Sequence, residues 1–118
     1  VVYADPEIAG AGLTEAEARA RGVDVAVARM PLGANGRFLA ETEGERGTIK
    51  VVAERSGQRL LGIHIAAPNA SEMIAATVIL IEQGLSIPEI QRIVFPHPTI
   101  SECIGEAMRN ADFGGRPA

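Results

Sequence analysis

Alternating apolar and polar residues predict β-strands in three stretches of the chain. Residues 23–28 alternate, with valine at every second position. Residues 48–54 and 59–67 are β-branched or alternating, and the Ser-Gly-Gln at residues 56–58 is typical of a turn between them. The second and third stretches should therefore form an antiparallel hairpin. A further short strand is predicted at residues 1–3, because an Asp-Pro-Glu sequence breaks the apolar pattern soon after it.

A second recurring pattern predicts where helices begin. Ser, Thr or Asn followed three residues later by Glu can form a capping box, in which each side chain bonds a backbone N–H of the other residue. The chain has this pattern at Thr14/Glu17, Asn69/Glu72, Ser86/Glu89 and Thr99/Glu102. We expect helices over residues 14–22 and 69–84, a short one from residue 86, and one over residues 99–110. Residues 31–36 indicate a loop, and residues 41–46 a polar surface segment.

The order of these elements predicts the fold class. A strand, a helix and a strand are followed by a hairpin and then by helices only, which is typical of an α+β fold. We expect a mainly antiparallel sheet with the helices packed on one face. One domain should extend over residues 1–112. Residues 113–118, with two Gly and a Pro, are expected to form a flexible tail.

The predicted helix over residues 69–84 is unusual because residues 73–81 are apolar around nearly its whole circumference. A surface helix ordinarily has one apolar stripe and one polar face. The sheet can cover one side, and a second chain is the simplest cover for the other. Complete burial inside one subunit is the alternative. We expect a homodimer, with an interface formed by Met73, Ile74, Thr77, Val78 and Ile81, together with Pro98.

Composition excludes several classes of function. The net charge is −4, aromatic residues make up 3% of the chain, and no basic run occurs, so nucleic acids and anionic membranes are not expected partners. A single Cys excludes an internal disulfide and a Cys-based zinc site. The apolar run at residues 73–85 is too short and too polar to cross a bilayer, and the first residues lack the charge pattern of a signal peptide. We therefore expect a cytoplasmic protein.

Three other features are interpreted as structural. The Gly-Ala-Gly at residues 10–12 resembles the start of a dinucleotide fingerprint, but Glu15 and Glu17 follow where bare N–H groups would have to face a phosphate. We interpret it as a tight turn, so this chain alone should bind no dinucleotide. His64 is expected on the less buried face of its strand, with a structural or surface role. It forms no metal site with His97, since no carboxylate or Cys spacing supports one. Cys103 is expected to be a small buried residue.

The candidate catalytic segment is residues 95–102, Phe-Pro-His-Pro-Thr-Ile-Ser-Glu. Two prolines hold His97 in an extended loop, and Glu102 lies in the first turn of the helix that follows. An imidazole with a carboxylate that fixes its tautomer is suited to acid–base catalysis. The Thr99/Glu102 spacing equally indicates a capping box, and both roles remain open. We also predict a cis peptide bond between His97 and Pro98, because the loop must turn sharply and cis X–Pro bonds are accessible.

Three stretches together resemble a known family. Residues 5–18 read DPEIAGAGLTEAEA, residues 61–74 include LGIHI and PNASEMI, and residues 97–102 read HPTISE. In this order they are similar to the C-terminal dimerisation domain of the flavoprotein pyridine nucleotide–disulfide oxidoreductases, with dihydrolipoyl dehydrogenases as the most similar branch. The likeness extends over residues 1–112.

The resemblance implies a role for this domain in a larger enzyme. The FAD- and NAD(P)-binding domains would precede it in the polypeptide and are not in this chain, which should be inactive and free of cofactor by itself. His97 would be the base that deprotonates a dithiol at the partner subunit's active site, and Glu102 would orient it. Phe95, Pro96 and His97 would contact the partner's flavin. A lipoyl-bearing multienzyme complex is a further expected partner. One carboxylate is not expected to serve fully both as orienter and as helix cap.

One position departs from the family pattern. Phe95 stands two residues before His97, where dihydrolipoyl dehydrogenases often have a second His. Glutathione-type reductases share the motif, so a sister disulfide reductase stays an alternative to the NAD-linked oxidation of dihydrolipoamide. A non-catalytic dimerisation or interaction module is the other alternative.

Overall fold

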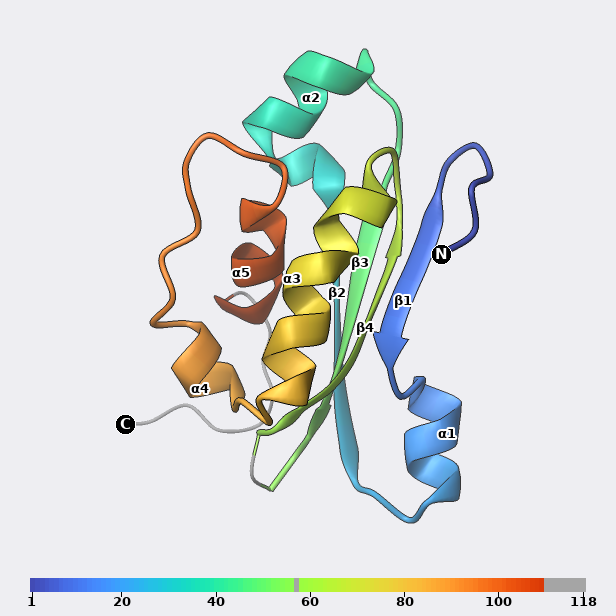
Figure 1. Cartoon of the computed structure of the whole chain (residues 1–118), viewed down its shortest axis with the longest axis vertical. Coiled ribbons are helices and arrows are strands. Elements are labelled where there is room, and N and C mark those ends of the chain that lie inside the picture. Colours follow the sequence, from blue (N-terminus) through green and yellow to red (C-terminus); the bar gives the residue numbers. More distant parts are fainter. Residues whose placement is uncertain (57, 110–118) are drawn as a thin grey trace.

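A four-stranded antiparallel sheet forms the centre of the computed structural model, which describes residues 1–56 and 58–109 (Figure 1). The strands are β1 (Ile8–Gly12), β2 (Val25–Pro31), β3 (Thr48–Glu54) and β4 (Leu60–Ala66), in the spatial order β1-β4-β3-β2. The α+β class and the β3–β4 hairpin are thereby confirmed. The tail predicted at residues 113–118 lies outside the described residues.

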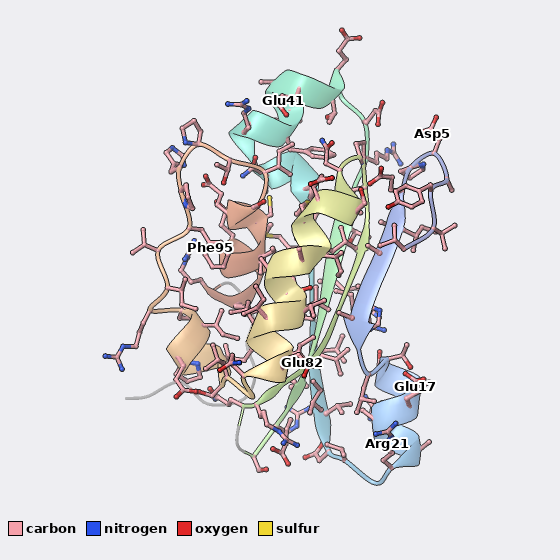
Figure 2. The ribbon with its side chains drawn as sticks, viewed as in Figure 1. Asp5, Glu17, Arg21, Glu41, Glu82 and Phe95 are labelled. Carbon is pink, nitrogen blue, oxygen red and sulfur yellow. The ribbon has the colours of Figure 1, made fainter. Side chains whose placement is uncertain are left out.

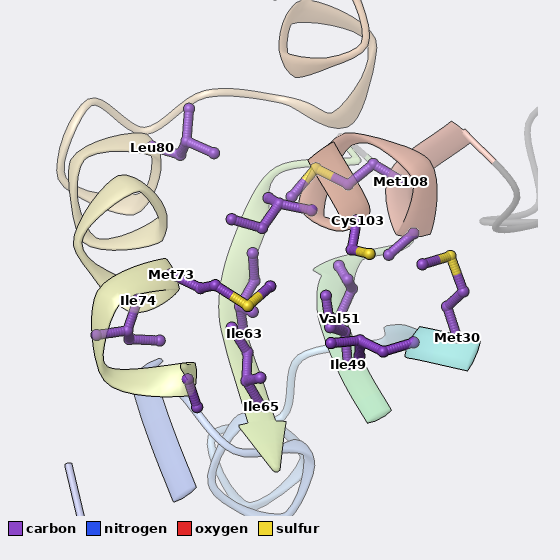
Figure 3. Close-up of a cluster of buried hydrophobic side chains, with 14 of the residues drawn as sticks. Met30, Ile49, Val51, Ile63, Ile65, Met73, Ile74, Leu80, Cys103 and Met108 are labelled. Carbon is purple, nitrogen blue, oxygen red and sulfur yellow. The ribbon is translucent and has the colours of Figure 1, made fainter. Parts of the chain in front are cut away.

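The core lies between one face of the sheet and the helices α3 (Ala70–Glu82) and α5 (Glu102–Arg109). Strand alternation turns every second side chain of β3 and β4 toward these helices, so that Val51 and Ile63 are fully buried. Helix α3 packs on β1 and β4, and α5 packs on β3 and β2. Figure 3 shows Met73 of α3 and Met108 of α5 reaching the same layer of aliphatic side chains.

One helix lies on the opposite face, which refines the predicted arrangement. Helix α1 (Glu15–Ala20) buries Ala18 in a second, smaller cluster with Val25, Val52 and Leu61. Val52 lies between two β3 residues that face the main core, so its own side chain points the other way. Not all the helices share one face of the sheet.

The first strand is displaced from its predicted position. Val2 makes only a single bridge to Ile8, and the strand itself is Ile8–Gly12. We interpreted residues 10–12 as a tight turn. In the structure they belong to β1, and each of them pairs with a residue of β4. The site is tightly packed, because a Cβ at Gly10 would lie 2.7 Å from Nδ1 of His64 and the imidazole would have to shift. The predicted turn was therefore wrong, and these glycines instead allow two strands to pack closely.

Helix α2 (Gly36–Thr42) was not predicted; it begins at the end of the expected loop and runs into the expected polar segment. A short 3-10 helix, Leu32–Ala34, precedes it, and Asn35 caps it by accepting a hydrogen bond from the Phe38 N–H at 2.8 Å. Leu32 and Phe38 are fully buried in the main core. These two anchors fix a short helix whose other residues are half polar and half small or apolar, so periodicity did not indicate it.

Three of the four predicted capping boxes form, the Thr99/Glu102 box among them, and the one at Asn69 does not. Thr14 and Glu17 bond reciprocally at the start of α1, and Ser86 bonds Glu89 at the start of α4 (Ile87–Ile90). Asn69 adopts a left-handed conformation with φ of 63° and makes no side-chain capping bond. The backbone N–H of Ser71 instead donates to the Glu7 carboxylate at 2.9 Å. A residue 64 positions earlier in the chain thus caps α3.

The packing of α3 changes the set of residues available to a partner chain. Met73, Ile74 and Thr77 are 2%, 8% and 0% exposed, because they face the chain's own core. Val78 and Ile79 are 43% and 63% exposed on the opposite side of the helix. Of the residues expected at an interface on this helix, only Val78 is freely accessible, and Ile79 joins it.

No helix within residues 1–56 and 58–109 is long and apolar enough to cross a membrane.

Candidate acid–base site

The segment that carries His97 connects α4 to α5 and is attached to α5 at several points. Gln91 donates from Nε2 to the Met108 carbonyl at 2.9 Å, which ties the start of the segment to the end of α5. Phe95 is half-buried and packs against the core beside Gly105 of α5. Figure 2 labels Phe95 on this segment, next to α5. The Phe95 ring therefore anchors the loop two residues before His97.

His97 is exposed except for its contact with Glu102. Its side chain is 80% exposed, whereas that of Glu102 is 10% exposed. Nδ1 of His97 lies 2.8 Å from Oε1 and 2.9 Å from Oε2 of Glu102. A carboxylate only accepts hydrogen bonds, so Nδ1 carries the proton in this pair. Nε2 is then left as the proton-accepting atom.

The Glu102 carboxylate bonds His97 and caps the helix at once, contrary to our expectation that it could not satisfy both partners fully. Oε2 accepts the Thr99 N–H at 2.9 Å, and the Glu102 N–H donates to Thr99 Oγ1 at 3.2 Å, completing a capping box. An ionised carboxylate has about four lone-pair positions, enough for both partners. The Thr99 N–H, and after it His97, lower the pKa of Glu102. Both bonds favour the charged form that orients His97.

Thr99 is held from three sides and connects the site to α2. Its Oγ1 donates to the Pro96 carbonyl at 2.6 Å, and its N–H bonds Glu102. Its carbonyl accepts a hydrogen bond from Nδ2 of Asn35 at 3.1 Å. Asn35 is only 4% exposed. Sequence reasoning placed Asn35 in a loop; the preference of Asn for helix N-caps was the available signal.

The other residues that we predicted at the site or at the interface differ in exposure. The His97–Pro98 bond is cis, as predicted. Pro96 and Pro98 are exposed, whereas Phe95 packs into this chain. Pro98 lines a groove of about 270 Å³ between α2, the start of α3 and the segment that precedes α5. Met73 also reaches this groove. The groove thus brings together two residues that we expected at a dimer interface.

Cys103 and His64 stand outside the site chemistry. Cys103 is fully buried, and burial raises the pKa of its thiol to about 12. Such a thiol stays protonated at neutral pH and is a poor nucleophile. His64 donates from Nε2 to the Leu13 carbonyl at 3.1 Å, on the face of the sheet opposite α3. No group of three or more His, Cys, Asp or Glu side chains that could hold a metal occurs in the described part of the chain.

The chain matches the family described as pyridine nucleotide-disulphide oxidoreductase, dimerisation domain, over residues 1–108. It belongs to this family. Among curated proteins it is 43% identical over 107 residues to a dihydrolipoyl dehydrogenase of Thermus scotoductus, covering 91% of this chain and 23% of that protein. It is 44% identical over 110 residues to dihydrolipoyl dehydrogenase 2 of Haloarcula marismortui, covering 93% of this chain and 23% of that protein.

Solved structures agree with the family assignment. The HOCl-induced flavoprotein disulfide reductase RclA of Escherichia coli superposes with a TM-score of 0.83 at 27% identity, over 92% of this chain and 25% of that one. LpdA of Mycobacterium tuberculosis gives a TM-score of 0.82 at 28% identity, over 91% of this chain and 23% of that one. The chain therefore spans about a quarter of the length of these relatives. More than nine-tenths of this chain shares its fold with part of each of these two structures.

Proposed function

We propose that this chain is the dimerisation domain of an FAD- and NAD(P)-dependent disulfide oxidoreductase of the dihydrolipoyl dehydrogenase type. In this proposal, His97 is the acid–base residue of a site that the partner subunit completes. The observation that carries the proposal is the His97–Glu102 pair, a buried carboxylate bonded at 2.8 Å to a histidine whose side chain is 80% exposed. The exposed ring of His97 is open to contact from another subunit, which supports a site completed from outside.

The chemistry follows from the tautomer that Glu102 imposes. A free thiol with a pKa near 8.5 is only a few per cent ionised at pH 7, and the thiolate is the nucleophile in disulfide exchange. Nε2 of His97 would accept the S–H proton of a bound dithiol. The resulting thiolate would attack one sulfur of the enzyme disulfide, and the other sulfur would leave as a thiolate. Glu102 would stabilise the imidazolium formed at His97.

FAD and NAD(P), when bound by other domains of the polypeptide, would carry the electron pair away from the reduced disulfide. This chain offers those cofactors no phosphate cradle among its described residues. Residues 10–12 form a strand, and the first turn of α1 carries Glu15 and Glu17. The only contribution toward the flavin would come from the His97 segment, through exposed Pro96 and His97. Phe95 would support this segment without touching the flavin, because its ring packs against the core beside α5.

The same proposal includes a homodimer. Val78 and Ile79 form an exposed apolar side of α3, and Pro98 is exposed at the groove beside the start of that helix. We place the interface on these residues. Met73, Ile74, Thr77 and Ile81 would support them from the side of α3 that packs on the core. Such a dimer would bring each His97 to the opposite subunit. A cytoplasmic location and a lipoyl-bearing multienzyme complex complete the proposal.

The test is kinetic and uses the full-length protein. His97→Gln should lower the rate of dithiol oxidation by about 10²–10⁴-fold, the usual contribution of a positioned acid–base group. Glu102→Gln should cause a smaller loss, because it removes the orienting charge and leaves the base. Transfer of electrons from NADH to an artificial acceptor needs no thiol deprotonation and serves as the control reaction. A His97→Gln protein that oxidises dithiols at the normal rate would leave only a non-catalytic dimerisation module.

A glutathione-type or other sister reductase is the second candidate, since Phe95 replaces the His often found in dihydrolipoyl dehydrogenases. The structural likeness to the disulfide reductase RclA supports this second candidate. Comparing initial rates with dihydrolipoamide and with oxidised glutathione distinguishes the two. A dihydrolipoyl dehydrogenase should oxidise the first with NAD and leave the second unreduced.

A further inference from the structure

We propose that Asn35 is a positioning residue for His97, acting from α2 through Thr99 and Glu102. The inference rests on the proposed function, because it concerns how the same base is aimed. It starts from a polar side chain that is 4% exposed and makes two hydrogen bonds in opposite directions. Oδ1 accepts the Phe38 N–H at 2.8 Å, and Nδ2 donates to the Thr99 carbonyl at 3.1 Å.

The first bond fixes Asn35 to a rigid part of the molecule. It caps α2, whose Phe38 is fully buried in the main core, and the Asn35 N–H donates to the carbonyl of fully buried Leu32 at 2.9 Å. The side chain of Asn35 is thus held at both of its ends. Its amide nitrogen presents a donor at a fixed point beside the loop that carries the catalytic motif.

The second bond transmits this fixed point to the imidazole. It holds the carbonyl of Thr99, and the N–H and Oγ1 of the same residue form the capping box with Glu102 at 2.9 and 3.2 Å. The Glu102 carboxylate then holds Nδ1 of His97. Because the His97 side chain is 80% exposed, little else among the described residues restrains its ring. A shift of the Thr99 peptide would therefore move the carboxylate and the imidazole together.

A helix cap alone is the simpler explanation of Asn35, but it uses only Oδ1. Among the caps of α1, α2 and α4 in the described residues, Asn35 of α2 is the one that also bonds the catalytic segment. The amide nitrogen is the part that a Ser or Asp cap would lack. That nitrogen is therefore where the two explanations can be separated.

The decisive variant is Asn35→Ser in the full-length enzyme. Serine still caps α2, yet it cannot reach the Thr99 carbonyl with a second group. We expect the kcat of dithiol oxidation to fall by about tenfold, since displacing a catalytic group by about 1 Å can cost 10²-fold. NADH-dependent reduction of an artificial acceptor should be unchanged. Asn35→Asp, which keeps the size and the cap but replaces the donor with an acceptor, should show the same loss and serves if the Ser variant is unstable.

Three further measurements distinguish an effect on the position of His97 from a loss of stability. Thr14→Ala removes a comparable cap from α1, far from the loop, and should lower the melting temperature without lowering kcat. In a His97→Gln background, Asn35→Ser should cause no further loss, because a residue that acts through His97 has nothing left to position. Selective ¹⁵N-histidine spectra should show the Nδ1–H tautomer of His97 less populated in Asn35→Ser.

The outcomes separate this inference from the proposed function. If His97→Gln leaves dithiol oxidation intact, the proposed function fails and the inference with it. If His97→Gln is impaired but Asn35→Ser matches Thr14→Ala in kcat, only the inference fails. An additive loss in the double variant would also overturn it, since Asn35 would then act independently of His97.

Discussion

Replacing Gly105 with Ala should lower activity while the chain stays folded. An added Cβ would lie 2.8 Å from Cδ2 and 3.0 Å from Cε2 of the Phe95 ring. Carbon atoms in ordinary contact are about 3.5–4.0 Å apart, so the ring must retreat by roughly 0.7 Å. Phe95 is connected to His97 through Pro96 alone, and the displacement should reach the imidazole.

The effect on stability should be limited because two contributions oppose each other. Ala in place of Gly stabilises a helix interior by about 1 kcal/mol. Forcing an extra methyl group into a packed site costs about 1–3 kcal/mol. The free energy of unfolding should therefore fall by no more than about 2 kcal/mol. Dithiol oxidation should fall by about tenfold or more, because misplacement by about 1 Å can cost 10²-fold.

The assay is steady-state dithiol oxidation by the full-length protein, with thermal unfolding measured in parallel. Shortening the obstructing ring should compensate, so Gly105→Ala combined with Phe95→Leu should recover much of the lost rate. Gly33→Ala is the matched control, because a Cβ at Gly33 meets nothing within 4 Å. Normal turnover in Gly105→Ala, or a double variant no better than the single one, would refute the view that Phe95 on Gly105 holds the catalytic loop.

Three other predictions test the fold and the interface. Gly62→Ala should lower the free energy of unfolding by about 2–4 kcal/mol in urea denaturation, because its Cβ would lie 2.0 Å from the backbone oxygen of Leu13; an unchanged midpoint would contradict the crossing of these two segments. Bonds from backbone N–H groups lower the pKa values of Glu7 and Glu102 in the folded state, so their stabilisation is complete above the unfolded value and is lost as pH falls below about 4.5. The melting temperature should therefore drop between pH 5 and 3, with a shallower slope in Glu7→Gln, and equal slopes would count against that bond. Ile79→Asp should weaken self-association in sedimentation without unfolding the chain, since Ile79 is 63% exposed; an unchanged sedimentation profile would remove Ile79 from the interface.

Several features of this protein were determined locally and could be predicted from sequence. The β3–β4 hairpin follows from strand alternation on both sides of a short turn. The capping boxes at Thr14 and Ser86 need only residues three positions apart, and both form. The pairing of His97 with Glu102 is equally local, since five positions separate them. Their spacing across one loop and the first turn of a helix already placed the two side chains within reach.

Only the tertiary structure decided the rest, because those contacts join distant parts of the chain. Glu7 caps α3 at Ser71, and Asn35 holds Thr99; 64 positions separate the partners in each pair. Periodicity describes which face of an element is apolar, but it contains no information about which distant polar group will meet a helix end. The burial of Met73 and Ile74 likewise depends on where the sheet lies relative to α3. An apolar helix could be recognised from its sequence, whereas the side left for a partner was fixed by packing against β1 and β4.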